Sequence, residues 1–387
     1  MSSMILDAPL QSICKCHFCS ECDGTGCIGE MPGMGGFSQN VNFIRNCADW
    51  AVVEEEIKNL GNKEYTKLLS AAIPVVRLAP ITGGIENVGY STEKGFYKDI
   101  IAAVYKAGCK LSIGDGCPDI KLLSGIEAVK SLSSTGAVGA GVSRFGSTGA
   151  SSGAVGAGAG SVSSAVSETV ASGEYASFGS TGADFALGEG VSSGMTGSVC
   201  ASSGTTNPPP KAAVFIKPYP QSRIFERVEW SAPVAEYIGV DIDSYSILTM
   251  RNLVKLEKKT ASQLIEIKKE AANKGIPFAV KGVFTREDVE LMQEVRPDVI
   301  VISNHGGRVE NRAGSSAVFM AKNAATLRGY CGELWVDGGI RKYRDLQTAA
   351  YFGISQVMIG RPFISALCRG GSTEVRLAYE NLINPTH

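Results

Sequence analysis

A histidine and an arginine lie three positions apart in the segment SNHGGR, residues 303–308, directly after the apolar run DVIVI. An imidazole can accept a proton near neutral pH and a guanidinium pairs with carboxylates, so this pairing indicates chemistry on a carboxylate-bearing substrate. The chain has two other histidines, His17 in a cysteine cluster and His387 at the last position. His305 is therefore the candidate general base and Arg308 the candidate substrate ligand. An ordinary glycine turn with a hydrogen-bonded histidine would use the same residue types.

Lysine, glycine and arginine residues follow other predicted strands. Lys281 comes after the run at 277–280 and places an ammonium where a developing negative charge needs compensation, although rim lysines are common. The segments DGGIR at 337–341 and GR at 360–361 follow the last two predicted strands. In barrels these two loops often hold a phosphate on backbone amides, with glycines allowing close approach and arginines adding charge. The pattern therefore predicts a phosphate-bearing cofactor.

Asp243 and Tyr219 are further candidates, each with a structural alternative. Asp241 and Asp243 end a predicted strand, and we expect one carboxylate to face inward and the other a neighbour. Asp243 could hold the His305 imidazole in one tautomer, or it could be a helix cap or a solvated carboxylate. Tyr219 could donate a hydrogen bond to a substrate carboxylate, or it could pack on the barrel rim. The sequence leaves both pairs of alternatives open.

Short β-branched runs alternate with amphipathic helical stretches over most of the chain. Helices are predicted at 262–273 and at 286–294, the second with Thr285 as its N-cap. This alternation is typical of repeated βα units around a parallel sheet, and eight units predict a closed (β/α)8 TIM barrel. The predicted strands are 73–78, 109–113, 212–216, 239–242, 277–280, 299–302, 334–336 and 356–359.

Residues 131–210 consist almost entirely of Ser, Gly, Ala, Val and Thr, and FGSTGA at 145–150 recurs at 178–183. Such a segment cannot offset its own ordering entropy, so we expect a disordered insertion produced by repeat expansion. A β-rich self-associating segment is the alternative, which the glycine content weakens. The segment follows the predicted helix 119–130 and so enters an αβ connection, on the face opposite the active site. The barrel is then split into 51–130 and 211–387, after an N-terminal Cys-rich arm at 1–50.

Five of the eleven cysteines crowd into residues 14–27 of the N-terminal arm, a spacing that suits a tetrahedral thiolate site. A zinc ribbon would need a second distant CxxC pair, and an iron–sulfur cluster would need four of these five thiolates. Redox-active thiols and a passive cysteine-rich arm are the alternatives. The candidate metal ligands are Cys14, Cys16, Cys19, Cys22 and Cys27.

The charge balance of the chain bounds its partners. With 37 basic and 38 acidic side chains the net charge is −1, which argues against nucleic acid and anionic membrane surfaces. No basic segment followed by an apolar one opens the chain, and no run of about 18 uncharged apolar residues occurs. We therefore expect a cytoplasmic protein that acts on small molecules.

The motifs SNHGGR at 303–308, DGGIR at 337–341 and GRP at 360–362, together with Lys281-Gly282, resemble the flavin-dependent α-hydroxy-acid oxidases and dehydrogenases. Glycolate and lactate oxidases are familiar members. The resemblance is strong from 278 to 366 and fainter from 73 to 243. It implies FMN as the cofactor, a small 2-hydroxy acid as the substrate, a separate electron acceptor and a homo-oligomer.

The resemblance also implies roles for individual residues. His305 would be the active-site base paired with Asp243, and Arg308 would clamp the substrate carboxylate with help from Tyr219. Lys281 would lie at the flavin N1–C2=O side, where its charge favours the anionic reduced ring. The implied flavin contacts are Pro80, Ile81, Thr82, Ser112 and Ser303, and the implied phosphate site comprises Asp337, Gly338, Gly339, Arg341, Gly360 and Arg361.

The chain departs from the family pattern after the second predicted strand. The segment IGDG at 113–116 stands where the family usually supplies a tryptophan or tyrosine. Two alternatives to a hydroxy-acid oxidase follow. One is a flavin-dependent isomerase of the type 2 isopentenyl-diphosphate isomerase kind, and the other is a non-catalytic FMN-binding scaffold.

Overall fold

The structure, a computed structural model, describes residues 41–134, 208–246, 254–309 and 312–385. All of them belong to one compact unit. The five clustered cysteines and most of the predicted insertion at 131–210 lie outside the described residues. Residues 41–50, the last ten of the expected N-terminal arm, form the first half of helix α1.

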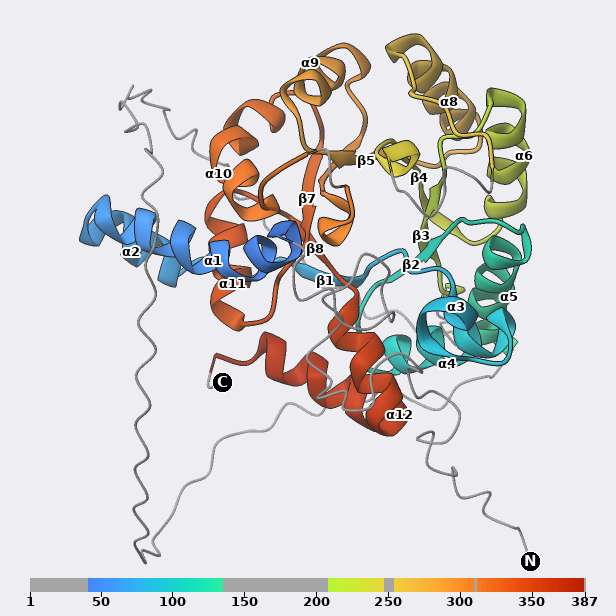
Figure 1. Cartoon of the computed structure of the whole chain (residues 1–387), viewed down its shortest axis with the longest axis horizontal. Coiled ribbons are helices and arrows are strands. Elements are labelled where there is room, and N and C mark those ends of the chain that lie inside the picture. The colour runs from blue at the N-terminus through green and yellow to red at the C-terminus, as the bar shows by residue number, and fades with distance from the viewer. Residues whose placement is uncertain (1–40, 135–207, 247–253, 310–311, 386–387) are drawn as a thin grey trace, which may run out of the picture. The chain divides into compact units, whose positions relative to one another are not determined.

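Eight parallel strands form a barrel with helices around it (Figure 1). The hydrogen-bonded order is β1-β8-β7-β6-β5-β4-β3-β2, and Leu78 N to Lys110 O (2.8 Å) and Lys110 N to Val76 O (3.1 Å) join β1 to β2. The predicted (β/α)8 TIM barrel is therefore confirmed. The strands are β1 (Val75–Leu78), β2 (Leu111–Gly114), β3 (Ala212–Ile216), β4 (Ala235–Asp241), β5 (Phe278–Val283), β6 (Val299–Ile302), β7 (Glu333–Asp337) and β8 (Gln356–Ile359).

Helix starts follow the capping signals in the sequence. Thr285 caps α9 by accepting a hydrogen bond from Asp288 N, as predicted, and Thr260 caps α8 in the same way through Gln263 N. The helices are α1 (Val41–Asn59), α2 (Asn62–Leu69), α3 (Gly84–Val88), α4 (Glu93–Lys106), α5 (Ile120–Ser134), α6 (Gln221–Ser231), α8 (Ala261–Asn273), α9 (Arg286–Val295), α10 (Ser316–Leu327), α11 (Tyr343–Tyr351) and α12 (Arg361–Ile383), with 3-10 turns η2 (Ser244–Ser246) and η3 (His305–Gly307).

Alternate side chains of the strands fill the inside of the barrel, and the others pack under the helices. Inside, Phe215 of β3 lies beside Gly239 of β4, where a Cβ would come within 2.6 Å of the phenyl ring. The start of the strands is closed by Arg77, which donates to Gln356, to Leu111 O and to Glu236. The barrel is thus a packed core with polar residues left at the opposite end.

One predicted strand limit was wrong in a way that affects the site. We expected Lys281-Gly282 after the fifth strand, but both residues lie within β5. Ser112 lies within β2, in agreement with the predicted strand at 109–113. Gly282, at φ +94°, shifts the register between β5 and β6, and this irregularity lets β5 continue to Val283. The side chains of Lys281 and Ser112 consequently project from strands and not from loops.

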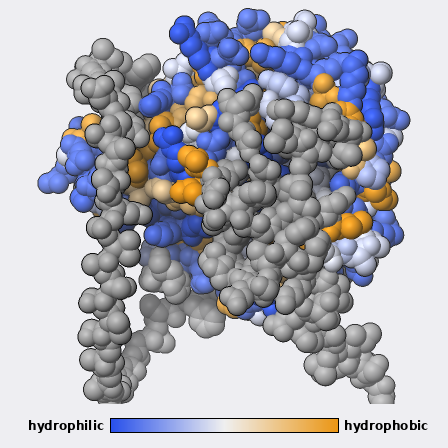
Figure 2. Space-filling view, viewed as in Figure 1, coloured by the Kyte–Doolittle hydropathy of each residue, from blue (hydrophilic) through white to orange (hydrophobic). Residues whose placement is uncertain are grey.

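On the face drawn in Figure 2, hydrophobic residues are interspersed with hydrophilic ones wherever the surface is coloured. None of the described helices combines the length and the apolar character needed to span a lipid bilayer.

Candidate active site

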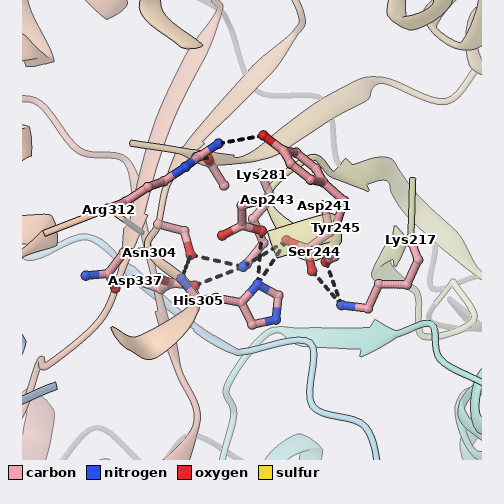
Figure 3. A network of polar contacts seen from close by, with 12 residues as sticks. Lys217, Asp241, Asp243, Ser244, Tyr245, Lys281, Asn304, His305, Arg312 and Asp337 are labelled. Carbon is pink, nitrogen blue, oxygen red and sulfur yellow. Dashed lines mark hydrogen bonds and ion pairs between the residues drawn. The ribbon is translucent and has the colours of Figure 1, made fainter. Parts of the chain in front are cut away.

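Charged side chains from several strands meet at the C-terminal end of the barrel (Figure 3). Asp241 ends β4 and Asp337 ends β7, while Lys281 lies near the end of β5. Lys217 follows β3, and His305 begins η3, which follows β6. Because all eight strands run in one direction, their ends share a rim, and residues far apart in the chain come within hydrogen-bond distance there.

His305 is held by carboxylates on one side of its ring. Its Nδ1 lies 3.0 Å from Asp243 Oδ1 and 3.6 Å from Asp241 Oδ1. The anionic carboxylate of Asp241 beside Nδ1 favours the tautomer that carries the hydrogen on Nδ1 and leaves the lone pair on Nε2. In Figure 3 this second ring nitrogen points away from both carboxylates. The basic nitrogen is therefore available to a ligand.

Asp241 is a central residue that the sequence analysis did not select. Its Oδ2 lies 2.9 Å from Lys217 Nζ, and its Oδ1 lies 3.2 Å from Lys281 Nζ. The expectation that Asp241 and Asp243 face different ways was wrong, because side chains two positions apart on an extended chain lie on the same face. That period of two was the signal that would have identified Asp241.

Burial and charge set the protonation of this group. Burial lowers the pKa of His305 well below its usual value, which Lys281, Lys217 and Arg308 reinforce and Asp241 opposes. Burial, together with the neighbouring Asp241, raises the pKa of Asp243 well above its usual range. For Asp241 burial acts upward, but the positive groups around it prevail and hold its pKa well below normal. The imidazole is thus neutral and able to act as a base near neutral pH.

Lys281 and Arg308 bring positive charge to the same place. Lys281 Nζ contacts Ser303 Oγ at 3.0 Å and Asp337 Oδ2 at 3.4 Å besides Asp241. Burial acts to lower the pKa of Lys281, but the carboxylates around it raise it above its usual value. Burial lowers the pKa of Arg308 to about 10, against the attraction of Asp241 and Asp337, and its buried Nε has no hydrogen-bond partner among the described residues.

The ring of Tyr219 packs between two arginines and does not join the histidine cluster. The guanidinium carbons of Arg223 and Arg227 each lie 4.5 Å from the ring centroid. Arg227 in turn pairs with buried Asp115 at 2.9 Å, after β2. The phenolic hydroxyl is buried without a hydrogen-bond partner in the described part of the chain, and burial raises its pKa. These contacts favour the packing alternative for the ring, and a substrate contact by the hydroxyl stays a prediction.

The residues implied for the flavin ring lie at the same rim. Pro80 and Thr82, in the loop after β1, pack against Gly114 at the end of β2, where a Cβ would come within 2.9 Å of Pro80 O. Ile81 accepts a hydrogen bond from Tyr97 through its backbone oxygen (2.8 Å). Ser112 Oγ is buried on β2 without a described partner. Because buried polar groups normally find partners, the free Ser112 hydroxyl fits a bound polar ligand such as the flavin ring.

The residues implied for the phosphate lie at or directly after the ends of β7 and β8. The glycines after β7 have a different role from the one that the sequence analysis predicted. We expected Gly338 and Gly339 to admit a phosphate; in the structure a Cβ at Gly339 would overlap the backbone oxygen of Asn46 in α1. Arg361 donates to Gly306 O at 3.2 Å, and its guanidinium lies over the ring of Phe43 of α1. Arg341 donates to Ile340 O, and Gly360 precedes α12. The positive-φ glycines of the loop after β7 thus pack against α1, and a phosphate contact by these residues stays a prediction.

Asp241, Asp243 and His305 each offer a ligand atom, and these atoms lie within 4.8 Å of one another. A metal ion could use such a spacing. However, Asp241 is already neutralised by Lys217 and Lys281, and its carboxylate oxygens point at their ammonium groups. We therefore assign the cluster to hydrogen bonding and not to metal binding.

Comparison with known proteins points to one group of enzymes. Residues 215–386 match the family described as FMN-dependent dehydrogenase. A 2-hydroxyacid oxidase from Dictyostelium discoideum is 38% identical over 109 residues, which are 28% of each chain. A 4-hydroxymandelate oxidase from Amycolatopsis orientalis is 36% identical over 111 residues, 29% of this chain and 31% of that one. The matches thus span less than a third of these relatives.

A crystal structure of a mandelate oxidase variant covers 93% of this chain and 86% of its own, with a TM-score of 0.52 and 16% identity. At this identity the likeness supports the fold alone, and it agrees with the barrel described above. The sequence match is more specific, because it contains Lys281, His305 and Arg308. The comparisons therefore show that residues 215–386 of this chain are similar to the FMN-dependent dehydrogenase family.

Proposed function

We propose that this chain uses FMN to oxidise a small 2-hydroxy acid to the corresponding 2-oxo acid. The observation that carries the proposal is the neutral imidazole of His305, held at Nδ1 by Asp243, with the Arg308 guanidinium near enough to lower the imidazole pKa. A base and a cation whose Nε has no described partner suit a substrate with a hydroxyl next to a carboxylate. The names of the relatives, 2-hydroxyacid and 4-hydroxymandelate oxidases, support the same substrate class.

The roles of the side chains follow from their contacts. Arg308 binds the substrate carboxylate and turns the 2-hydroxyl toward Nε2 of His305. His305 accepts the hydroxyl proton. Asp241 and Asp243, which lie next to Nδ1, stabilise the resulting imidazolium. The hydrogen on carbon 2 leaves together with two electrons, and that carbon becomes a carbonyl. FMN, when bound, would supply the acceptor for these two electrons and for that hydrogen.

The proposed cofactor contacts are those of the barrel rim. Lys281 provides a fixed positive charge from β5, which favours negative charge on a neighbouring ring. The other groups proposed to hold FMN are Pro80, Ile81, Thr82, Ser112 and Ser303 for the ring, and Asp337, Gly338, Gly339, Arg341, Gly360 and Arg361 for the phosphate.

Several expectations from the sequence stay predictions. They are the cytoplasmic location, the homo-oligomer, the separate electron acceptor and the metal or iron–sulfur site at the N-terminal cysteines. The domain limits also stay predictions, apart from the helical start at Val41.

Anaerobic reduction of the bound flavin tests the proposal. Purified protein is loaded with FMN, and the yellow absorbance is followed after adding glycolate, lactate or mandelate. We expect at least one acid to bleach it. His305→Gln should keep FMN bound but slow bleaching by about a hundredfold to ten-thousandfold, the usual contribution of a general base. Arg308→Met should raise the substrate concentration needed, with Arg308→Lys between the two.

The alternatives give different results. A flavin-dependent isomerase would stay oxidised with every hydroxy acid. A non-catalytic scaffold would also stay oxidised, and His305→Gln would then change nothing. Protein that remains colourless after incubation with FMN would overturn the proposal and both alternatives.

A further inference from the structure

We propose that Asn46 of helix α1 is a positioning residue. It holds the His305 loop after β6 (residues 303–308) and the phosphate loop after β7 (residues 337–341) in one arrangement. The proposal rests on the proposed function for its purpose, although its geometry stands on contacts that involve no ligand. No residue of α1 belongs to the predicted site, and the helix lies outside the residues that match the family.

The loop that carries His305 has an unfavourable backbone. His305, Gly306 and Gly307 have φ angles of +58°, +66° and +90°, so three consecutive residues are left-handed. A histidine in this region is uncommon and costs about 1–3 kcal/mol, so it persists only where surrounding groups fix it. The loop therefore needs support from outside.

Asn304 and Asn46 supply that support as a reciprocal pair. Asn304 Oδ1 accepts from Gly307 N at 3.0 Å and so caps the left-handed turn. Asn46 Nδ2 donates to the same Oδ1 at 2.8 Å, and Asn304 Nδ2 donates back to Asn46 Oδ1 at 3.0 Å. Both side chains are buried, and Asn46 Oδ1 also accepts from Ser316 N. The turn of His305 is thus fixed by a residue on another element.

The same helix turn contacts the phosphate loop. A Cβ at Gly338 would lie 3.1 Å from Asn46 Nδ2, and Trp50, one turn along α1, donates to Gly338 O at 2.9 Å. Asn46 therefore stands between the loop after β6 and the loop after β7. A displacement of α1 would move the base and the phosphate ligands together.

The test measures both loops in Asn46→Ala. FMN affinity is measured by fluorescence titration. The ionisation of His305 is measured by NMR of 15N-histidine protein, where the three histidines are assigned with His305→Gln. We expect about tenfold weaker FMN binding, as for the loss of buried hydrogen bonds. We also expect the pKa of His305 to rise toward its usual value of about 6.5, because a loosened loop admits water.

Matched variants separate positioning from helix docking. Asn42→Ala removes another buried asparagine of α1, which bonds Val309 O and Gly314 N but not Asn304. It should leave FMN affinity and the His305 pKa near the wild-type values. Asn304→Ala should reproduce the effect of Asn46→Ala, and the double variant should be no worse than either. Asn304→Ala carries the test alone if Asn46→Ala does not fold.

Two outcomes would overturn the inference: unchanged FMN affinity and His305 ionisation in Asn46→Ala, or equal effects from Asn42→Ala. If the wild type binds no FMN, the proposed function fails, but the NMR titration still decides the role of Asn46. The titration is interpreted against every charged group near the ring, namely Asp241, Asp243, Lys217, Lys281 and Arg308, with Asp49 of α1 bonded to Ser315.

Discussion

The two aspartates beside His305 carry different charges, and their neighbours explain why. Asp241 receives an ammonium on each oxygen, from Lys217 and from Lys281, and is thereby stabilised as an anion. Asp243 is completely buried, and its Oδ2 has no hydrogen-bond partner among the described residues. Two adjacent buried carboxylates cannot both ionise cheaply, so the proton stays on Asp243. The imidazole therefore faces one anionic carboxylate, Asp241, and one protonated carboxyl group, Asp243.

Asp243→Asn should stabilise the protein near neutral pH. The folded pKa of Asp243 lies above its unfolded value, so folding becomes less favourable as pH rises from about 3.8 through the folded pKa. An amide carries no such cost. We expect a Tm increase of about 2–4 °C at pH 7, which corresponds to about 1 kcal/mol, and no difference below about pH 3.8. Calorimetry across pH checks this, and a lower Tm for Asp243→Asn at pH 7 would contradict it.

Lys281→Met should have the opposite effect on stability. It leaves Asp241 with one ammonium and removes the ion pair of Asp337, and breaking a buried ion pair typically costs about 3–5 kcal/mol. Urea denaturation measures the loss. Lys94→Met is the control, because its pair with Glu127 is exposed and should contribute little. Similar losses of unfolding free energy in Lys281→Met and Lys94→Met would show that the buried ion pairs of Lys281 stabilise the protein no more than an exposed pair does.

The separate chemical groups could be predicted from sequence, but their pairing could be predicted only partly. His305, Lys281 and Arg308 were found because they follow apolar runs, and Asp243 was placed beside His305 correctly. Asp241 was missed because the strand period was misapplied. Lys217 was missed because one lysine in a turn carries no signal until its partner is known. Charge compensation depends on distances across the barrel, which no local pattern contains.

At the level of elements, the loops after β6 and β7 take their shape from α1. The glycines of the loop after β7 were predicted to approach a phosphate, yet Gly339 approaches α1, as does Gly307 of the loop after β6. Sequence alone could not reveal this, because a glycine shows where a Cβ is excluded but not what excludes it. The helices with capping boxes at Thr260 and Thr285 were predictable, since their signal is local.

Gly339→Ala should displace α1 and destabilise the protein. The residue has φ +78°, and its new methyl group would overlap the backbone of Asn46. Gly275→Ala is the matched control, because Gly275 has φ +68° but no atom within 4 Å of the Cβ position. The control should lose about 1 kcal/mol from backbone strain alone, and Gly339→Ala should lose more. Denaturation curves compare the two variants. Equal losses of unfolding free energy would mean that α1 moves to accommodate the methyl group at no cost in stability.

For the molecule as a whole, the barrel was the most predictable feature. The position at which the segment 137–207 enters the chain was the most informative feature for locating the site. Eight βα repeats give a long-range pattern that survives errors of a few residues at each strand end. The segment 137–207 leaves the described chain after α5 and rejoins it before β3. Both ends therefore belong to a helix-to-strand connection, whereas the candidate site lies where strands end.

Replacing residues 137–207 with a short Gly/Ser linker should therefore leave the site intact. The shorter connection changes the closure entropy by only about 1–2 kcal/mol, because that entropy grows slowly with loop length. We expect FMN affinity and the rate of flavin reduction within about twofold of the full chain, since αβ connections lie at the face opposite the chemistry. Fluorescence titration and anaerobic reduction measure both. A large loss of reduction rate with unchanged thermal stability would show that the segment acts on the site, and the assignment of the chemistry to the strand ends alone would then be incomplete.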